Sequence, residues 1–219
     1  MEMQVWLGFY REILSDFGFS EEADMASASL LNSLLSTESP LILEGLIRGR
    51  EVNIFGAGPS LEDLRSIPDG VNIAADGACT FLQEKGVIPH MVVTDLDGRI
   101  DDIQAANREG AIIVLHAHGD NMEEIRRYAP SFTGAYGTTQ TEPFGRLLNF
   151  GGFTDGDRAG FLAEHFRPRK ITFYGMDFEG PAGRYSFTRD WRIKRKKLLW
   201  AKRLVQHMME TSEVEITLA

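Results

Sequence analysis

Apolar residues recur every three or four positions near the start of the chain. One stripe consists of Val5, Phe9, Ile13 and Phe17, and a second consists of Leu30, Leu31, Leu34 and Leu35. Such spacing is typical of amphipathic helices, and Ser20 before Glu21 and Glu22 makes a favourable helix start. We therefore predict that residues 1–49 form an N-terminal helical segment that covers a cleft or contributes to a subunit interface.

From residue 50 onward, short apolar runs alternate with stretches of helical periodicity. The runs, which are β-branched or aromatic and predict strands, are residues 52–55, 71–75, 91–94, 111–116 and 171–174. The helical stretches between them include residues 60–66, 78–85, 100–108 and 121–128. This alternation predicts an α/β fold with right-handed crossovers. We expect an open, mostly parallel, Rossmann-like sheet with helices on both faces, to which residues 214–218 add an edge strand.

Polar residues gather directly after these predicted strands. They include glycine, aspartate and histidine, and they lie at residues 56–60, 76–78, 95–98, 116–121 and 175–177. In an open α/β sheet the carboxyl ends of the strands form one edge, here called the carboxyl edge, and ligands bind there. The five loops are therefore expected to meet at a single site.

Charge narrows the classes of ligand. The 219 residues include 23 basic and 32 acidic side chains, a formal net charge of −9. Without a broad positive surface, the chain is a poor binder of nucleic acid. Nine of the basic residues lie between Arg184 and Arg203 beside one acid, Asp190, and this concentration predicts a local anion site.

The composition also indicates a compartment. No apolar run reaches the roughly 18 residues of a membrane span, and residues 1–14 lack the basic and apolar regions of a signal peptide. The single cysteine, Cys79, cannot form an internal disulfide, which is typical of a reducing compartment. The sequence thus predicts a soluble cytoplasmic protein that does not bind membranes.

The glycine-containing loop at residues 56–60 is the first candidate site. Gly56 and Gly58 permit the close approach of a ligand, and Pro59 and Ser60 begin a helix whose free N–H groups suit a phosphate. The loop lacks the third glycine of a dinucleotide fingerprint and the Gly-Lys-Ser/Thr ending of a P-loop. A phosphate cradle and a tight turn without a ligand are equally supported.

The segment Asp95-Leu96-Asp97-Gly98 is a sharper signal. A turn at Gly98 brings both carboxylates towards one cation, and two acids without sulfur or histidine suit Mg²⁺, which also bridges to substrate phosphates. The alternative is an Asx turn with a helix cap, because Asp before Gly is ordinary turn chemistry. A further Asp-Gly pair, Asp76-Gly77, follows the preceding predicted strand and favours the metal.

His116 and His118 open another hypothesis. A His-x-His pair supplies two imidazoles to a transition metal in several metal-dependent hydrolases. Such sites need more histidines, however, and His165 and His207 fall within predicted helices away from the carboxyl edge. The milder interpretation is polar contact with a substrate, made by His116, His118, Asp120 and Asn121.

Three more segments carry polar side chains. Thr154 and Asp155 begin a predicted helix, so they either cap it or approach a metal–phosphate complex. Residues 136–141 supply hydroxyls and an amide that suit a heterocycle, or they form a plain polar loop. Lys194 and Lys197 share a helix face within the basic segment, where one or two cations facing the carboxyl edge would neutralise polyphosphate charge.

As a set, the motifs resemble those of one enzyme family. Residues 55–61 (Phe-Gly-Ala-Gly-Pro-Ser-Leu), 75–78 (Ala-Asp-Gly-Ala), 93–98 (Val-Thr-Asp-Leu-Asp-Gly) and 116–121 (His-Ala-His-Gly-Asp-Asn) follow the order found in the archaeal 6-hydroxymethyl-7,8-dihydropterin pyrophosphokinases. The segments at 153–158 and 175–178 continue this order, so the resemblance covers about residues 50–205. That family is similar in turn to the thiamine pyrophosphokinases. The chain departs from both at His90, where Asp is expected.

The resemblance implies that residues 50–219 form a pyrophosphokinase catalytic domain. Its reaction would be the ATP- and Mg²⁺-dependent transfer of diphosphate to the hydroxymethyl group of 6-hydroxymethyl-7,8-dihydropterin, with release of AMP. ATP and the pterin alcohol would be its partners, and a homodimer is left open. The alternatives are a thiamine pyrophosphokinase, a metal-dependent hydrolase that uses His116 and His118, and a non-catalytic nucleotide-binding domain.

The resemblance also implies a role for each candidate residue. Mg²⁺ would be held by Asp95, Asp97 and Asp155, with Asp76 in support. Catalysis is assigned to Asp95, Asp97, Lys194 and Lys197, of which the lysines would balance the charge of the transferred group. Nucleotide contacts are expected at Gly56, Gly58, Pro59, Ser60, Asp76 and Gly77. Substrate contacts are expected at His116, His118, Asp120, Asn121, Thr154 and Asp155.

Overall fold

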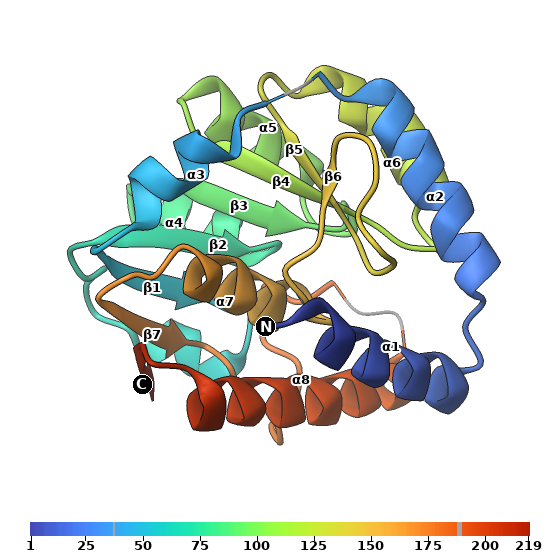
Figure 1. Cartoon of the computed structure of the whole chain (residues 1–219). Helices are drawn as coiled ribbons and strands as arrows, with labels where there is room; N and C mark the ends of the chain where they lie inside the picture. The colour runs from blue at the N-terminus through green and yellow to red at the C-terminus, as the bar shows by residue number, and fades with distance from the viewer. Residues whose placement is uncertain (37, 188–189) are drawn as a thin grey trace.

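The computed structural model describes residues 1–36, 38–187 and 190–219 (Figure 1). Its described strands form one eight-stranded sheet in the order β6-β5-β4-β3-β2-β1-β7-β8, and the seven pairings along it are parallel. The strands are β1 (Glu51–Phe55), β2 (Val71–Ala75), β3 (Met91–Thr94), β4 (Ile112–Ala117), β5 (Tyr136–Thr139), β6 (Leu147–Leu148), β7 (Lys170–Tyr174) and β8 (Glu215–Leu218). The helices are α1 (Met3–Phe17), α2 (Glu21–Leu34), α3 (Pro40–Ile47), α4 (Ala78–Glu84), α5 (Ile100–Arg108), α6 (Met122–Tyr128), α7 (Asp155–His165) and α8 (Trp191–Thr211), with the short 3-10 helices η1 (Pro59–Asp63) and η2 (Ala129–Ser131).

Helices cover both faces of the sheet, which confirms the α/β prediction. Side chains alternate between the two faces of a strand, so Ile54 packs into one apolar layer and Phe55 into the other. Helices α1, α3, α7 and α8 contribute to the layer of Ile54, and α2, α4, α5 and α6 contribute to the layer of Phe55. Strands buried on both faces are continuous apolar runs, which is why the sequence pattern located β1, β2, β3, β4 and β7. The predicted edge strand is β8, which pairs with β7.

Two predicted segments differ from the structure. The polar segment at residues 136–141 was expected as a loop, but its first four residues form β5, and β6 extends the sheet beyond it. The apolar pattern misses β5 because its threonines are buried through hydrogen bonds, such as the one from Thr138 Oγ1 to Leu115 O at 3.2 Å. The predicted helix at residues 60–66 is only the 3-10 helix η1. Leu61 is its buried side chain, so a longer helix would gain little from packing.

The N-terminal helices pack onto these layers. α1 lies beside α8 (Figure 1), where Arg203 pairs with Glu12 at 2.6 Å. α2 begins after Ser20, whose Oγ accepts a hydrogen bond from Ala23 N at 3.2 Å, as predicted, and it packs against α6 and β5. The division of the chain at residue 49 stays a prediction. No helix in the described ranges is both long and apolar enough to cross a membrane.

The strand order has a reversal at β1. From β1 the chain adds β2 to β6 on one side and then β7 and β8 on the other. In doubly wound sheets such a reversal opens a crevice at the carboxyl edge, where ligands bind. The loops that follow β1 and β7 therefore meet at the position where a ligand is expected.

Candidate active site

A cavity of about 860 Å³ lies at the carboxyl edge of the sheet. Its wall includes the loops after β1, β2, β3, β4 and β7, which are the five loops predicted to meet there. The first turns of α7 and α8, the turn between α1 and α2, helix α6 and Gln140 after β5 also line the cavity. The N-terminal helices thus cover part of a cleft, which is one of the two roles predicted for them.

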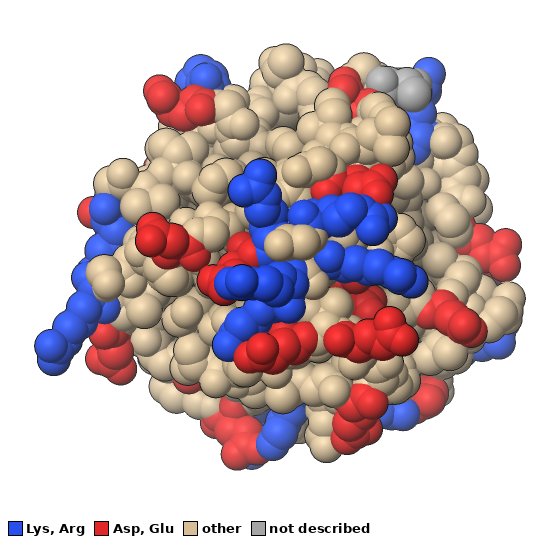
Figure 2. All heavy atoms as spheres, turned by 60° about the vertical axis from the view of Figure 1, so that its left-hand side comes forward, with Lys and Arg blue, Asp and Glu red and all other residues tan. Residues whose placement is uncertain are grey.

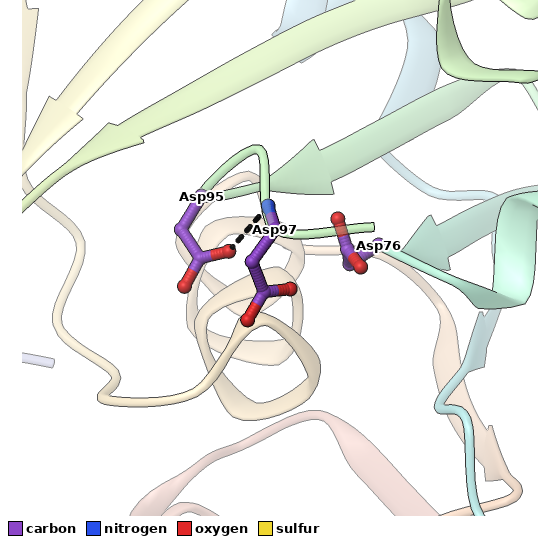
Figure 3. Close-up of side chains that lie close together, drawn as sticks. All are labelled: Asp76, Asp95 and Asp97. Atoms are coloured by element: carbon purple, nitrogen blue, oxygen red, sulfur yellow. Dashed lines mark hydrogen bonds between the residues drawn. The ribbon is translucent and has the colours of Figure 1, made fainter. Parts of the chain in front are cut away.

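Three carboxylates lie together on this wall. Asp76 follows β2, and Asp95 and Asp97 follow β3 (Figure 3). One oxygen from each lies within 4.8 Å of the others, and this is the one such group of acid, histidine or cysteine ligands among the described residues. Carboxylate oxygens at this spacing suit Mg²⁺ or another hard divalent cation. We call Asp76, Asp95 and Asp97 the carboxylate cluster.

The charges within the carboxylate cluster are unequal. Burial and the charge of Asp95 raise the pKa of Asp76 to about 6, and burial with both neighbouring acids raises the pKa of Asp97 to about 8. Burial also opposes ionisation of Asp95, but the hydrogen bond from His118 and nearby positive charges outweigh it and lower the pKa of Asp95. Acids that repel one another in this way form a site that a cation stabilises.

One residue of the carboxylate cluster, Asp76, and its neighbour Leu96 have an unusual backbone conformation. The backbone angle φ is 43° at Asp76 and 71° at Leu96, and residues other than glycine rarely adopt positive values of this kind. The buried hydroxyl of Thr94 holds both, because it donates to Asp76 Oδ1 at 2.6 Å and accepts from Leu96 N at 2.8 Å. Sequence reasoning missed Thr94. Its one signal is its place between the apolar strand and the first aspartate.

The loop after β4 supports Asp95 through an imidazole. His118 Nε2 lies 3.2 Å from Asp95 Oδ2, and His118 Nδ1 accepts from Asp120 N at 3.3 Å. Since Nδ1 is the acceptor, Nε2 carries the proton and donates to the carboxylate. His118 and Asp120 both line the cavity, and their role in substrate binding stays a prediction.

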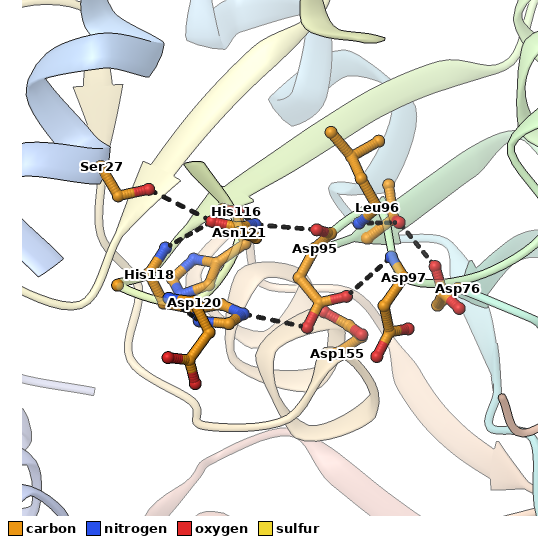
Figure 4. A network of polar contacts seen from close by, with 12 residues as sticks. Ser27, Asp76, Asp95, Leu96, Asp97, His116, His118, Asp120, Asn121 and Asp155 are labelled. Atoms are coloured by element: carbon orange, nitrogen blue, oxygen red, sulfur yellow. Dashed lines mark hydrogen bonds and ion pairs between the residues drawn. The ribbon is translucent and has the colours of Figure 1, made fainter. Parts of the chain in front are cut away.

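Asn121 lines the cavity and also joins its loops, and a substrate contact by Asn121 stays a prediction. Its Nδ2 donates to Asp95 O at 2.8 Å and to His116 O at 2.7 Å, while its Oδ1 accepts from His118 N at 3.0 Å and from Ser27 Oγ at 3.2 Å (Figure 4). Both amide hydrogens are therefore used within the protein. Asn121 is 3% exposed and joins the loops after β3 and β4 to α2.

His116 lies behind the cavity wall. His116 is 1% exposed. His118, the other histidine of the His-x-His motif, lines the cavity, and His116 does not. His116 Nδ1 lies 2.9 Å from Thr138 Oγ1, whose own proton goes to Leu115 O, so the imidazole is the donor. Burial lowers the pKa of His116 well below its usual value. The two histidines thus face different partners, and the geometry does not support the zinc hydrolase.

The glycine loop is joined to the loop after β7. The three N–H donors and their acceptors are Gly56 N with Tyr174 O (2.8 Å), Gly58 N with Gly175 O (2.8 Å) and Ser60 N with Asp177 Oδ2 (2.9 Å). These donors, predicted to bind phosphate, therefore have partners inside the protein, and Pro59 has no N–H to offer. The glycines have a packing reason instead, because a Cβ at Gly56 or Gly58 would lie 2.7 or 2.6 Å from Gly175 O. The tight turn is thus the better interpretation for this loop.

The first turn of α7 separates two acids with different roles. Asp157 is fully buried and accepts from Phe153 N at 2.6 Å and Thr154 N at 2.9 Å, so it caps the helix. Asp155 lines the cavity and pairs with Arg158 at 3.1 Å. Burial and the charge of Asp95 raise the pKa of Asp155 well above its usual value. The structure groups Asp76, not Asp155, with the other two acids, and Asp155 as a metal ligand stays a prediction.

Among the described residues, the cations on the cavity wall are Arg127, Arg158, Lys194 and Lys197, and the last three lie near the acids described above. Arg158 is 3% exposed and donates to Phe153 O at 3.0 Å as well as to Asp155. Lys194 and Lys197 of α8 line the cavity, at the carboxyl edge where one or two cations of this helix were predicted. The attraction of Lys194 limits the rise in the pKa of Asp76, and the attraction of Lys197 helps to lower the pKa of Asp95. Positive and negative groups thus face the same space.

Other cations of the basic segment point elsewhere. Lys196 pairs with Asp16 at 2.9 Å and Lys202 with Glu179 at 2.5 Å. Basic side chains also gather near the amino edge of the sheet, where Figure 2 shows them beside acidic ones. Lys170, the first residue of β7, pairs with Glu215 at 2.7 Å. Exposed pairs of this kind contribute little to stability. Residues 188 and 189 of the basic segment lie outside the described ranges.

The fold and the cavity together define a doubly wound α/β protein with a carboxylate-lined ligand site at its strand-order reversal. The chain belongs to the MptE-like family, described as "6-hydroxymethylpterin diphosphokinase MptE-like", whose profile matches residues 26–182. This match confirms the family that the sequence motifs resemble.

Relatives of known name match almost the whole chain. The 6-hydroxymethyl-7,8-dihydropterin pyrophosphokinase of Methanothermobacter thermautotrophicus is 44% identical, over 99% of this chain and 99% of the relative. The protein of the same name from Methanocaldococcus jannaschii is 41% identical, over 98% of this chain and 99% of the relative. Among solved structures, the MAf glycosyltransferase of Magnetospirillum magneticum AMB-1 matches 88% of this chain and 38% of its own, with 14% identity and a TM-score of 0.46.

Proposed function

We propose that the chain is a 6-hydroxymethyl-7,8-dihydropterin pyrophosphokinase, which transfers diphosphate from ATP to the hydroxymethyl group of the pterin and releases AMP. The observation that carries the proposal is one cavity whose wall holds the carboxylate cluster together with Arg158, Lys194 and Lys197, in a chain whose full-length relatives bear this name. The transferred group is strongly anionic. Enzymes of related phosphoryl chemistry act mainly by positioning and charge stabilisation.

Asp76, Asp95 and Asp97 are the proposed holders of Mg²⁺. Hard cations prefer oxygen ligands, and the repulsion that raises the pKa of Asp97 to about 8 is what a divalent cation would relieve. When bound there, Mg²⁺ would neutralise charge on the phosphate oxygens of ATP. Asp155, which lies beside Asp95 in Figure 4, remains a further candidate ligand.

The chain's own cations would bind the phosphates. Arg158 is buried and held by backbone carbonyls, so it offers a preorganised positive charge. Lys194 and Lys197 have flexible stems and compact charges. They can therefore follow the diphosphate as it passes from the donor to the acceptor oxygen.

His118 would keep the metal-binding loop in its working form. Its Nε2–H donates to Asp95 Oδ2 at 3.2 Å. This bond favours the ionised carboxylate, which is the form that binds a cation. Asn121 would act with it, because its amide holds Asp95 O at 2.8 Å.

The location and partners follow from the sequence. The single buried cysteine supports a reducing compartment, and we propose the cytoplasm. Burial raises the pKa of Cys79 to about 12, so the thiol stays protonated and unreactive. The acidic net charge of −9 supports small molecules, not nucleic acid, as partners.

A nucleotide assay tests the proposed reaction. The purified protein is incubated with ATP, Mg²⁺ and 6-hydroxymethyl-7,8-dihydropterin, and the nucleotides are separated. We expect AMP in an amount equal to the diphosphorylated pterin, and no AMP when thiamine replaces the pterin. ADP as the product would report transfer of a single phosphoryl group and would contradict the proposal.

A further inference from the structure

The strand order places the carboxylate cluster in the middle of the carboxyl edge. β3 and β2, which carry the cluster, lie between β4 and β5 on one side and β1 and β7 on the other. Neighbouring strands are about 4.8 Å apart, so each side extends roughly 10–15 Å from the cluster. Figure 4 shows the start of the first side, where His118 and Asp120 lie beyond Asp95 in the direction of Ser27. A reaction between two substrates at the cluster has room for one on each side.

The far end of the β5 side is formed by Gln140 and the turn between α1 and α2. Gln140 follows β5, lines the cavity and is 4% exposed. Its carbonyl oxygen accepts from Trp6 Nε1 at 2.7 Å, and its Nε2 donates to Asp24 Oδ2 at 3.3 Å. Helices α1 and α2 therefore fix both the backbone and the side chain of Gln140.

The surroundings of Asp24 set the orientation of the Gln140 amide. Asp24 accepts from Gly119 N at 2.7 Å and from Tyr10 Oη at 2.7 Å. Burial raises the pKa of Tyr10, so its hydroxyl stays protonated and donates. Because Asp24 presents acceptors, the amide nitrogen of Gln140 must face it. The amide oxygen Oε1 is left buried without a hydrogen-bond partner among the described residues.

An unpaired buried carbonyl is uncommon in native proteins, so Oε1 is a ready acceptor for a ligand N–H group. Aromatic side chains line the same cavity as Gln140. Phe19 and Phe153 line the wall, and both rings contact Phe17, with centroids 5.1 and 5.2 Å apart. An acceptor at the end of a space with aromatic walls suits a flat heterocycle that presents N–H donors.

On the basis of the function proposed above, we infer that the pterin ring binds on the β5 side and that Gln140 Oε1 accepts a hydrogen bond from its 2-amino group. The pterin presents this amino group and N3–H on one edge. The other side, formed by the loops after β1 and β7 at the strand-order reversal, takes the nucleotide. Gln140 is then a specificity-determining residue. Entry of the ring requires a small side-chain adjustment, which is common on binding.

The variant Gln140→Met tests the inference, since Met has a similar length and no amide. We expect the KM for the pterin alcohol to rise about tenfold, because a buried ligand donor loses its acceptor. The KM for ATP should stay within about twofold of the unchanged protein. Gln83→Met is the matched control, because the Gln83 amide donates to Asp102 O at 2.7 Å outside the cavity wall described above. It should change neither KM.

A ligand analogue tests the specific hydrogen bond. The pterin analogue with oxygen in place of the 2-amino group should bind the unchanged protein about tenfold more weakly than the pterin alcohol, by titration without ATP. In Gln140→Met this difference should largely disappear. Asp24→Asn is a second variant that reorients the amide, and it should also reduce the difference. A rise in the KM for ATP, or an undiminished preference for the 2-amino group in both variants, would overturn the inference. If the unchanged protein binds the pterin but releases no AMP, the proposed function fails and the subsite does not.

Discussion

The hydroxyl of Thr94 lies 2.6 Å from Oδ1 of Asp76 and so joins the last residue of β3 to the loop after β2. The same hydroxyl accepts from Leu96 N at 2.8 Å. Asp76 and Leu96 both have a positive φ, and strained residues of this kind persist only where the surrounding structure holds them. One buried side chain therefore sets the positions of two loops that carry the proposed metal ligands.

The variant Thr94→Val removes this hydroxyl and keeps the shape of the side chain. We expect the free energy of unfolding to fall by about 1–3 kcal/mol, the cost of leaving buried polar groups unpaired. The Mg²⁺ concentration for half-maximal AMP release should rise about tenfold, as it does when groups that orient metal ligands are lost. Thr94→Ser keeps the hydroxyl and should restore the Mg²⁺ requirement. Equal requirements in the two variants would contradict the role given to Thr94.

The carboxylate cluster predicts how stability depends on pH. Without a divalent cation, burial and neighbouring acids raise the pKa of Asp76 to about 6 and of Asp97 to about 8. The folded state then binds more protons than the unfolded chain above about pH 4, so stability should fall as the pH rises to 8. Mg²⁺ competes with these protons, and its apparent affinity should rise over the same range.

Thermal unfolding between pH 5 and 9, with and without Mg²⁺, checks this dependence. The stabilisation by Mg²⁺ should be larger at pH 8 than at pH 6. Asp97→Asn removes the group with the higher pKa and should flatten the upper part of the curve. A metal-free protein whose stability rises steadily from pH 6 to pH 8 would show that the acids are not coupled as described.

Loss of Lys194 or Lys197, which line the cavity, should lower kcat/KM for ATP more than loss of their neighbour Lys196. Lys194→Met and Lys197→Met each remove a cation that faces the carboxylate cluster, and kcat/KM for ATP should fall about a hundredfold. Lys196→Met is the matched control, because Lys196 pairs with Asp16 at 2.9 Å. Its kcat/KM should change by less than about threefold. A control variant as impaired as the other two would point to helix α8 as a whole.

The acids of α7 should separate stability from activity. Asp157→Ala removes the cap that accepts from Phe153 N and Thr154 N, so the free energy of unfolding should fall by about 1–2 kcal/mol. Asp155→Asn is the contrast, since the pKa of Asp155 is raised well above its usual value and Asn resembles the protonated acid. Its stability should change little, and any loss should appear in the AMP-release rate. Denaturant unfolding of both variants beside the assay decides this.

The sheet and much of the cavity could be predicted from local patterns. Apolar runs that end in polar loops locate β1, β2, β3, β4 and β7, and parallel strands bring their carboxyl ends together. That argument led directly to Asp95 and Asp97, while the concentration of basic residues on one helix led to Lys194 and Lys197. All four line the cavity. The predictions for β5 and for the glycine loop differ from the structure for the same reason. Hydrogen bonds between segments that are distant in the sequence leave no periodic pattern of apolar residues.

Particular residues illustrate this limit. From the sequence, the N–H groups of Gly58 and Ser60 were predicted to bind a phosphate. In the structure they donate hydrogen bonds to Gly175 and Asp177, which lie more than a hundred residues away in the sequence. Asp24 lies in the first turn of α2, where an acid is expected from the helix dipole alone, so nothing in the sequence singles it out. In the structure it is buried and lines the cavity. Long-range pairing decided the role of each of these residues.

The most direct test of the proposed function follows one phosphorus atom. ATP labelled with radioactive phosphorus at the β position is incubated with the protein, Mg²⁺ and 6-hydroxymethyl-7,8-dihydropterin, and the pterin is separated from the nucleotides. Transfer of the diphosphate moves the β label to the pterin and leaves unlabelled AMP, which is the result we expect. A pterin without label, with the β phosphorus retained in ADP or released as free phosphate, would contradict the proposed function.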